Sequence, residues 1–378
     1  MKVSRFLAIF LLAAMPTILL SQSDSSKFEF DTDFRFRIEQ DWNGLKDDGA
    51  KYDDRSRLRF RYRFGLNYQY NEWASFGFRL RSGALDDQQG PHLTLGSGTG
   101  EFSLFQIGFE KAFFKAENER IKLWLGKNTF PFWKQNELFW NNNVYPDGAA
   151  ISLKVRKKVS NSQLLQINLG HFIIRSSGKL FWDDAYFNGA QLVFKSPDTK
   201  LRIAPAFYNF RKLGNIPDQN GSYTLDYAIG QLSAEYNFKS ELPLKIGAEL
   251  YNNFVDYGKN DSVPLSMQGE TFGWVINAKL GKTKAKGDWA LWLYYANLEK
   301  YSIVDYFAQN DWARWDYSST GSTGSKISNF RGIESRIIYT FGPKFNLTLR
   351  IYYTERLMKE GIANGRNSRA RLDLNIKF

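Results

Sequence analysis

Residues 55–70 have the sequence RSRLRFRYRFGLNYQY, in which polar and apolar side chains alternate without interruption. One face would carry Leu58, Phe60, Tyr62, Phe64, Leu66, Tyr68 and Tyr70, and the other Arg55, Arg57, Arg59, Arg61, Arg63, Gly65, Asn67 and Gln69. Successive side chains of a β-strand point to opposite sides, so this stretch predicts a strand with one apolar and one polar face. A helix would mix the two sets on its surface.

The same alternation recurs along most of the chain. It is found near residues 28–39, 73–83, 102–115, 120–126, 149–159, 163–174, 185–195, 200–211, 226–238, 243–255, 270–281, 288–298, 330–341, 345–355 and 369–378. Together with 55–70 this gives about 16 predicted strands, the kind of even number that single-chain bacterial barrels prefer, and about 14 or 18 would also fit the pattern.

Short and long connections alternate between these strands. The short ones are 71–72, 117–119, 161–162, 196–199, 240–242, 282–287 and 342–344, and the long ones are 40–54, 84–101, 127–148, 175–184, 212–225, 256–269, 299–329 and 356–368. An up-and-down barrel in a membrane has this rhythm, with tight periplasmic turns and long extracellular loops. The predicted fold class is therefore all-β, a closed antiparallel transmembrane β-barrel that fills the chain from residue 22 to residue 378.

The two ends of the chain indicate where such a barrel would reside. Lys2 and Arg5 precede an apolar run, and Ser21 offers a small residue for cleavage, so residues 1–21 predict a signal peptide. The run is about 15 residues long and contains Pro16, short of the roughly 20 that a membrane anchor needs. Phe378 ends an alternating strand and resembles the assembly signal of outer-membrane barrels. We expect export to the outer membrane, with membrane lipid, lipopolysaccharide and the barrel-assembly machinery as partners.

If the apolar faces contact lipid, the arginines of the polar faces line the barrel interior. The predicted basic wall consists of Arg35, Arg37, Arg55, Arg57, Arg59, Arg61, Arg63, Arg79, Arg81, Arg369 and Arg371. In a water-filled interior this row would create a positive field that attracts anions. A second interpretation stays open beside it, in which the arginines pair with carboxylates and brace the wall.

Residues 127–148 form a long connection, KNTFPFWKQNELFWNNNVYPDG, that is too aromatic for a freely solvated loop. We expect it to fold inward and narrow the pore, with Glu137 and Asp147 facing the arginines. Its candidate constriction residues are Lys127, Phe132, Trp133, Glu137, Trp140 and Asp147. The alternative is a packed extracellular loop.

Two blocks of this sequence resemble a known family. The first is the arginine-rich strand followed by Trp73 and by FRLRSG at 78–83; the second is GKN at 126–128, Pro131-Phe132, LFWN at 138–141 and PDG at 146–148. Over residues 55–153 the chain resembles the putative porin family of Gram-negative outer membranes, and more distantly phosphate-selective-type porins. The chain has Lys127 and Asp147 where Arg and Glu would be expected, and both keep the charge. The resemblance implies a porin and leaves the solute open.

Other classes of function find little support. His92 in a loop is the one candidate catalytic base, and His171 shares a face with apolar residues, so we expect no enzyme and no catalytic residues. The absence of Cys excludes thiolate metal sites, and no metal or cofactor is expected. The Asp pairs near the loops are interpreted as solvated charge, with Ca²⁺ binding as the open alternative. The formal net charge of +12 lies on strands at period 2, which argues against nucleic acid as a partner.

The expected function is passive diffusion of small anionic or polar solutes, with a preference for anions. The alternatives are a substrate-selective channel for oligosaccharides or organic acids, and a soluble exported β-protein that binds carbohydrate. Assembly as a homotrimer stays open.

Overall fold

The structure is a computed structural model that describes residues 27–98, 100–156, 164–198, 200–215, 222–313, 327–359 and 361–378. The predicted signal peptide lies outside these residues. Within the described ranges no helix has the length and hydropathy needed to cross a bilayer.

The described chain contains seventeen strands and four single-turn 3-10 helices. The strands are β1 (Phe28–Leu45), β2 (Arg55–Gln69), β3 (Ala74–Ser82), β4 (Leu93–Thr94), β5 (Ile107–Glu117), β6 (Ile121–Lys127), β7 (Asp147–Arg156), β8 (Leu164–Arg175), β9 (Ala185–Lys195), β10 (Leu201–Gly214), β11 (Thr224–Phe238), β12 (Leu244–Asn253), β13 (Phe272–Gly281), β14 (Trp289–Leu298), β15 (Phe330–Gly342), β16 (Phe345–Arg356) and β17 (Arg366–Lys377). The helices are η1 (Phe181–Asp183), η2 (Tyr257–Lys259), η3 (Leu265–Met267) and η4 (Asp305–Phe307). The predicted strands are confirmed, with ends that differ by a few residues.

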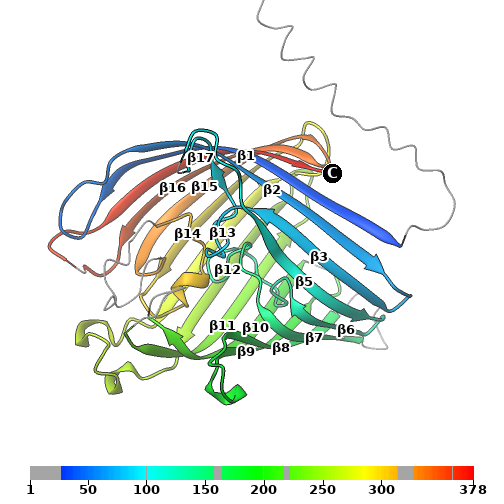
Figure 1. Ribbon diagram of the computed structural model, residues 1–378, viewed down its shortest axis with the longest axis horizontal. Helices are drawn as coiled ribbons and strands as arrows, with labels where there is room; N and C mark the ends of the chain where they lie inside the picture. Colours follow the sequence, from blue (N-terminus) through cyan, green and yellow to red (C-terminus); the bar gives the residue numbers. More distant parts are fainter. Residues whose placement is uncertain are drawn as a thin grey trace, which may run out of the picture.

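All pairings between neighbouring strands are antiparallel, and the sheet closes on itself (Figure 1). β1 pairs with β2 on one side and with β17 on the other, where Phe34 lies opposite Ile376 and Glu39 opposite Arg371. The backbone N–H of Phe378 donates to the carbonyl of Thr32 at 2.9 Å and extends this seam by one bond. Closure removes the exposed edges that an open sheet would present. With the two-residue β4 set apart, the sixteen remaining strands confirm the predicted closed barrel.

Apolar side chains cover the outside of the barrel, and the polar ones of β1, β2, β3 and β17 face its interior. On β2, 42% of Tyr62 is exposed but only 4% of the adjacent Arg61. On β1, Ile38 is exposed on the outside, whereas Glu39 is completely buried. The sidedness expected from the period-2 pattern is therefore present on these four strands, which turn their apolar residues toward the lipid.

The wall has uneven height between β2 and β7. β3 pairs with β2 only up to Arg63, and above it β4 supplies the next partner, with Thr94 opposite Arg59. The connection 83–106 is therefore partly built into the wall. Apart from the two-residue β4, β6 is the shortest strand of the wall, with seven residues.

The interior facing β8–β12 differs from a uniformly polar pore. Phe172, Phe187, Tyr208, Phe210 and Tyr251 point inward and are fully buried. They are covered by two long connections, 128–146 and the described part of 299–329, which fold into the barrel and complete an apolar core. Rings on an inner wall are stable only where other apolar groups exclude water from them.

Candidate functional site

The predicted basic wall lies on four adjacent strands, β3, β2, β1 and β17. Its eleven arginines are Arg35 and Arg37 on β1, Arg55, Arg57, Arg59, Arg61 and Arg63 on β2, Arg79 and Arg81 on β3, and Arg369 and Arg371 on β17. The alternation of each strand turns them all to the interior, and strand pairing brings them together, as where Arg37 lies opposite Arg59.

Glu39 and Asp41 neutralise the centre of this wall. The Glu39 carboxylate contacts Arg57, lies 2.8 Å from Nε of Arg371, and lies within 4 Å of Arg37 and Arg59. Two residues further along β1, the Asp41 carboxylate accepts from Arg55 at 2.8 Å and from Arg369. A buried carboxylate between several guanidinium groups offsets their mutual repulsion.

Three further strand carboxylates serve the rest of the wall. Asp373 on β17 accepts two hydrogen bonds from Arg37, at 2.6 and 2.8 Å, and Asp33 on β1 accepts from Arg61. Glu110 on β5 bonds Arg79 at 2.7 Å and Arg63 at 2.5 Å, with Arg81 at 3.9 Å. Such contacts are those expected from the second interpretation of the arginine row, in which carboxylates brace the wall.

The wall still carries an excess of positive charge. Within the described residues its eleven arginines share six carboxylates, namely Asp33, Glu39, Asp41, Glu110, Asp311 and Asp373. Some of the charge reaches water: the exposed fraction of the side chain is 38% for Arg55, 21% for Arg57 and 17% for Arg59.

Two arginines that the sequence analysis did not single out extend the wall. Arg336 on β15 bonds Glu334 and lies 3.7 Å from Glu137, and Arg350 on β16 lies 3.8 Å from Asp311. Both occupy inward positions of strands whose outer faces carry Ile333, Ile337 and Ile351. The alternation used for β2 would therefore have placed them on the interior.

The connection 128–146 lies inside the barrel and is fixed to β12. Glu249 accepts from the backbone N–H of Gln135 at 3.1 Å and from the side chain of Asn136 at 2.6 Å. Trp133 exchanges two hydrogen bonds with Gln191 of β9, at 2.7 and 2.8 Å. Both anchors put polar groups of the wall opposite the backbone of the connection, whose buried amides require partners.

One face of this connection is aromatic and packs on the inner wall. Phe130 stacks on Trp140 with 4.3 Å between ring centroids, and Phe132 lies edge-on to Tyr208 at 5.2 Å. Gly189 of β9 leaves room for this packing, because a Cβ there would lie 2.3 Å from the ring of Phe132. Phe130, Phe132 and Trp140 therefore belong to the apolar core.

The other face of the connection is polar and turns to the arginines. Asn143 accepts from Arg63 at 2.9 Å, and the hydroxyl of Tyr145 contacts Arg79. Burial raises the pKa of Glu137, but Arg336, together with Arg350 and Lys134, lowers it to a net value of about 2. Glu137 is therefore a permanent negative charge at neutral pH.

A second connection, 299–329, continues this contact toward β17. The carbonyl of Phe307 accepts from the backbone N–H of Asn141 at 2.8 Å, and Gln309 donates to Glu137 at 2.6 Å. Asp311 then reaches the basic wall, where it contacts Arg371 and Arg350. A chain of contacts thus crosses the interior from β12 to β17.

A family described as "Putative porin" matches residues 48–241. The chain belongs to this family. The match and the closed barrel indicate an outer-membrane porin. Comparison with curated proteins gives no match.

Solved porin structures share the fold of this porin. OmpF of Salmonella typhi, in complex with daunomycin, has a TM-score of 0.54 at 11% identity, covering 95% of this chain and 99% of its own. OprB of Pseudomonas putida has a TM-score of 0.56 at 11% identity, covering 93% and 94%. A porin of Rhodopseudomonas blastica has a TM-score of 0.51 at 11% identity, covering 93% and 100%. At these identities the likeness concerns the fold alone.

The expected position of Asp147 needs correction. Asp147 begins β7 instead of ending a loop, and its carboxylate lies 2.7 Å from Nζ of Lys127 at the end of β6. The two residues are direct partners in the β6–β7 pairing. Their charges therefore neutralise each other, and Asp147 does not oppose the basic wall.

The two histidines of the porin lie in different surroundings. His171 is exposed on the outer face of β8 and contacts Asn188 at 2.7 Å. His92 lies in the connection 83–106, and its carbonyl accepts from Arg59 at 3.1 Å. Burial lowers the pKa of His92 well below its ordinary range, and Arg37 and Arg61 lower it further. Among the described residues no group of three or more His, Asp or Glu residues could hold a metal ion.

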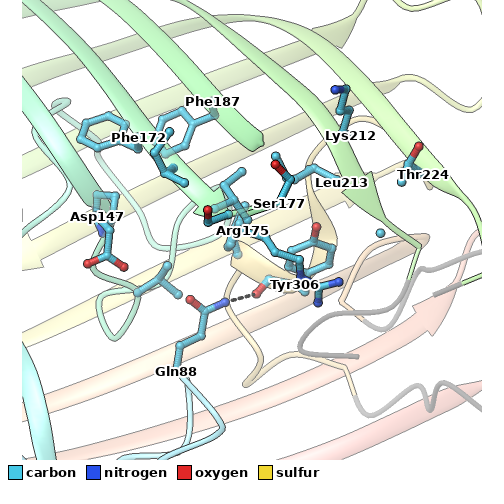
Figure 2. Close-up of a pocket in the computed structure, with 18 of the residues that line it drawn as sticks. Gln88, Asp147, Phe172, Arg175, Ser177, Phe187, Lys212, Leu213, Thr224 and Tyr306 are labelled. Carbon is cyan, nitrogen blue, oxygen red and sulfur yellow. Dashed lines mark hydrogen bonds between the residues drawn. The ribbon is translucent and has the colours of Figure 1, made fainter. Parts of the chain in front are cut away.

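A cavity of about 580 Å³ lies between the aromatic core and the extracellular ends of β7–β11 (Figure 2). The two in-folded connections contribute Trp140 and Tyr306 to it, and β8 and β10 contribute Arg175 and Lys212. The sequence analysis did not predict this cavity, because it requires the aromatic packing of segments far apart in the chain.

Proposed function

We propose that this porin conducts small polar solutes passively and prefers anions. The excess of wall arginines over carboxylates carries the proposal. A cluster of like charges facing a low-dielectric wall produces a local potential that concentrates counter-ions. Arg55, Arg57 and Arg59 have the exposed side chains through which a passing anion would feel this field.

The two in-folded connections support a path along the basic wall. Their aromatic groups fill the side of the interior next to β8–β12 and leave polar groups such as Glu137 and Asn143 toward the arginines. A solute would therefore pass beside the places where this acidic and amide-rich surface contacts the basic wall. In this arrangement Phe132, Trp133 and Trp140 set the position of the constriction by packing, and Glu137 sets its charge.

Residues 1–21 would direct export, Phe378 would be read by the assembly machinery, and lipid and lipopolysaccharide would surround the barrel, with a homotrimer as the state to test. We propose no catalysis, because the one candidate base, His92, is buried beside arginines that lower its pKa and so weaken it as a base.

The deciding experiment is a planar-bilayer recording under a KCl gradient. The wild-type porin should show a reversal potential of the sign that marks chloride as the more permeant ion. Replacing two partly exposed arginines together, Arg57→Glu and Arg59→Glu, should move the reversal potential toward cation selectivity, since each change reverses a charge in the proposed path.

Arg331→Gln is the matched control. Arg331 has a similar charge but belongs to an exposed pair with Glu355 on the outer side of β15 and β16. It should leave the reversal potential unchanged. A cation-selective wild type, or no response to the double reversal at positions 57 and 59, contradicts the proposal.

A further inference from the structure

The cavity between the aromatic core and the extracellular strand ends has the size of a small-molecule site. Its volume of about 580 Å³ lies within the roughly 300–1,000 Å³ that is usual for ligand pockets. It is lined by strand ends on the side of the long connections. Figure 2 shows side chains of β7–β11 around it, together with Tyr306 of the connection 299–329.

The floor of the cavity is rigid and apolar. Trp140 stacks on Phe307 at 4.8 Å and lies 5.2 Å from Phe187, which lies 4.5 Å from Phe172. All four residues are buried, so the rings are held by packing before any ligand arrives. Tyr306 is half-buried beside them and offers a larger part of its ring to the cavity.

The rim is polar, and most of its charges are already matched. Lys127 pairs with Asp147 at 2.7 Å and Lys212 with Asp183 at 3.7 Å. Arg175 and the hydroxyl groups of Ser177 and Thr224 also line the cavity. The rim therefore offers many donors and acceptors with little net charge, in contrast to the basic wall.

This combination selects a class of ligand. A simple anion finds more uncompensated positive charge at the basic wall than at the rim. A purely apolar molecule would cover the ammonium and carboxylate groups of the rim and leave them without water. A sugar ring satisfies both surfaces, because its C–H face can rest on aromatic rings while its hydroxyl groups bond with paired charged side chains.

We propose that this cavity is a binding site for a short neutral saccharide, of one to three rings by its volume, at the extracellular entrance of the channel. The proposal rests on the channel function and deepens it, since the site would retain sugars beside a path that favours anions. Tyr306 would supply the stacking surface, and Lys212 would donate to a sugar hydroxyl.

Isothermal titration of the full-length porin in detergent with maltose and maltotriose tests the proposal. The wild type should bind at least one of them saturably. Tyr306→Ala should weaken binding at least about fivefold, whereas Tyr306→Phe, which keeps the ring, should retain most of it. Tyr70→Ala is the control, because Tyr70 is exposed near the opposite, periplasmic end of β2.

Absence of saturable sugar binding in a correctly folded barrel, or equal binding by wild type and Tyr306→Ala, overturns the saccharide site. Tighter binding of benzoate or gluconate than of maltose does so as well, because the rim would then recognise charge. Anion selectivity is measured separately in bilayers: if it is lost while sugar still binds, the proposed function fails and the site remains.

Discussion

Glu39 shows how much of the basic wall depends on a single carboxylate. It is completely buried and lies within 4 Å of four arginines, on β1, β2 and β17. Removing one member of a buried ionic cluster leaves the others without compensation, which is more costly than losing an exposed pair.

Glu39→Gln should therefore lower the free energy of unfolding by about 3 kcal/mol. It should also increase the preference for chloride, because four guanidinium groups lose a common counter-charge. Urea unfolding followed by tryptophan fluorescence measures the first effect and the KCl reversal potential the second. Glu355→Gln, in the exposed pair with Arg331, should alter neither. Unchanged stability of Glu39→Gln would show that water, and not Glu39, compensates the arginines.

The charge of Lys134 makes the stability of the porin depend on pH. It lies in the connection 128–146 and donates to the carbonyl of Trp140. Burial lowers the pKa of Lys134 to about 8, although Glu137 and Glu249 oppose this shift. The residue is therefore charged below about pH 8 and neutral above it. The unfolded chain keeps this proton up to about pH 10.5 and must then bind more protons than the folded porin. The contribution of Lys134 to the free energy of unfolding therefore increases as the pH rises from 8 to 10.5.

Raising the pH from 7 to 9 should reduce the chloride preference of the wild-type porin. In Lys134→Met the reduction should be smaller, because the charge that is lost on titration is already absent. Reversal potentials recorded at both pH values for the two proteins measure the difference. Identical pH responses would assign the titration to other groups.

At the level of elements, the anchoring of the connection 128–146 determines whether the constriction is fixed or mobile. Glu249 of β12 holds the connection through Gln135 and Asn136 and also accepts from Ser233 at 3.0 Å. Without this carboxylate, a buried amide of the connection loses its partner, which favours displacement of the segment.

Glu249→Ala should raise the single-channel conductance and add current fluctuations. Glu235→Ala provides the control, since Glu235 is also buried and faces the interior but pairs with Lys245 at 3.7 Å and does not hold the connection. A conductance equal to that of the wild type in both variants would mean that the aromatic packing alone retains the segment.

The strands could be predicted from the sequence because each alternates between lipid and interior. The same rule placed Arg57 and Arg61 on the inner wall and would have placed Arg336 there. It could not reveal the inward rings such as Phe172 and Tyr208, since alternation does not distinguish a ring that contacts lipid from one that contacts an in-folded connection. The partner of Asp311 was likewise unpredictable, because it depends on how a long connection crosses the barrel.

At the level of the whole molecule, closure between β1 and β17 joins segments more than three hundred residues apart, as where Phe36 lies opposite Leu374. The sequence contains no Cys, so two engineered cysteines at this seam have no other thiol to react with in the chain. Phe36→Cys with Leu374→Cys should form a disulfide upon oxidation of the folded porin, visible as a mobility shift under non-reducing conditions.

Phe36→Cys with Leu372→Cys is the control, because Leu372 lies opposite Ile38 and is out of register with Phe36. Strand register fixes which side chains are neighbours, so only the first pair should cross-link efficiently. Equal cross-linking of both pairs would indicate a seam that slips.

The shortness of β6 affects the surrounding bilayer. Its seven residues are fewer than the roughly 9–11 that a tilted strand needs to match a bilayer of ordinary thickness. We therefore expect the bilayer to be thinner beside this part of the wall, and each Å of thinning costs a fraction of a kcal/mol. Lipids with shorter acyl chains reduce this cost, so they should be enriched around β6, and lipids with longer chains around the longer strands.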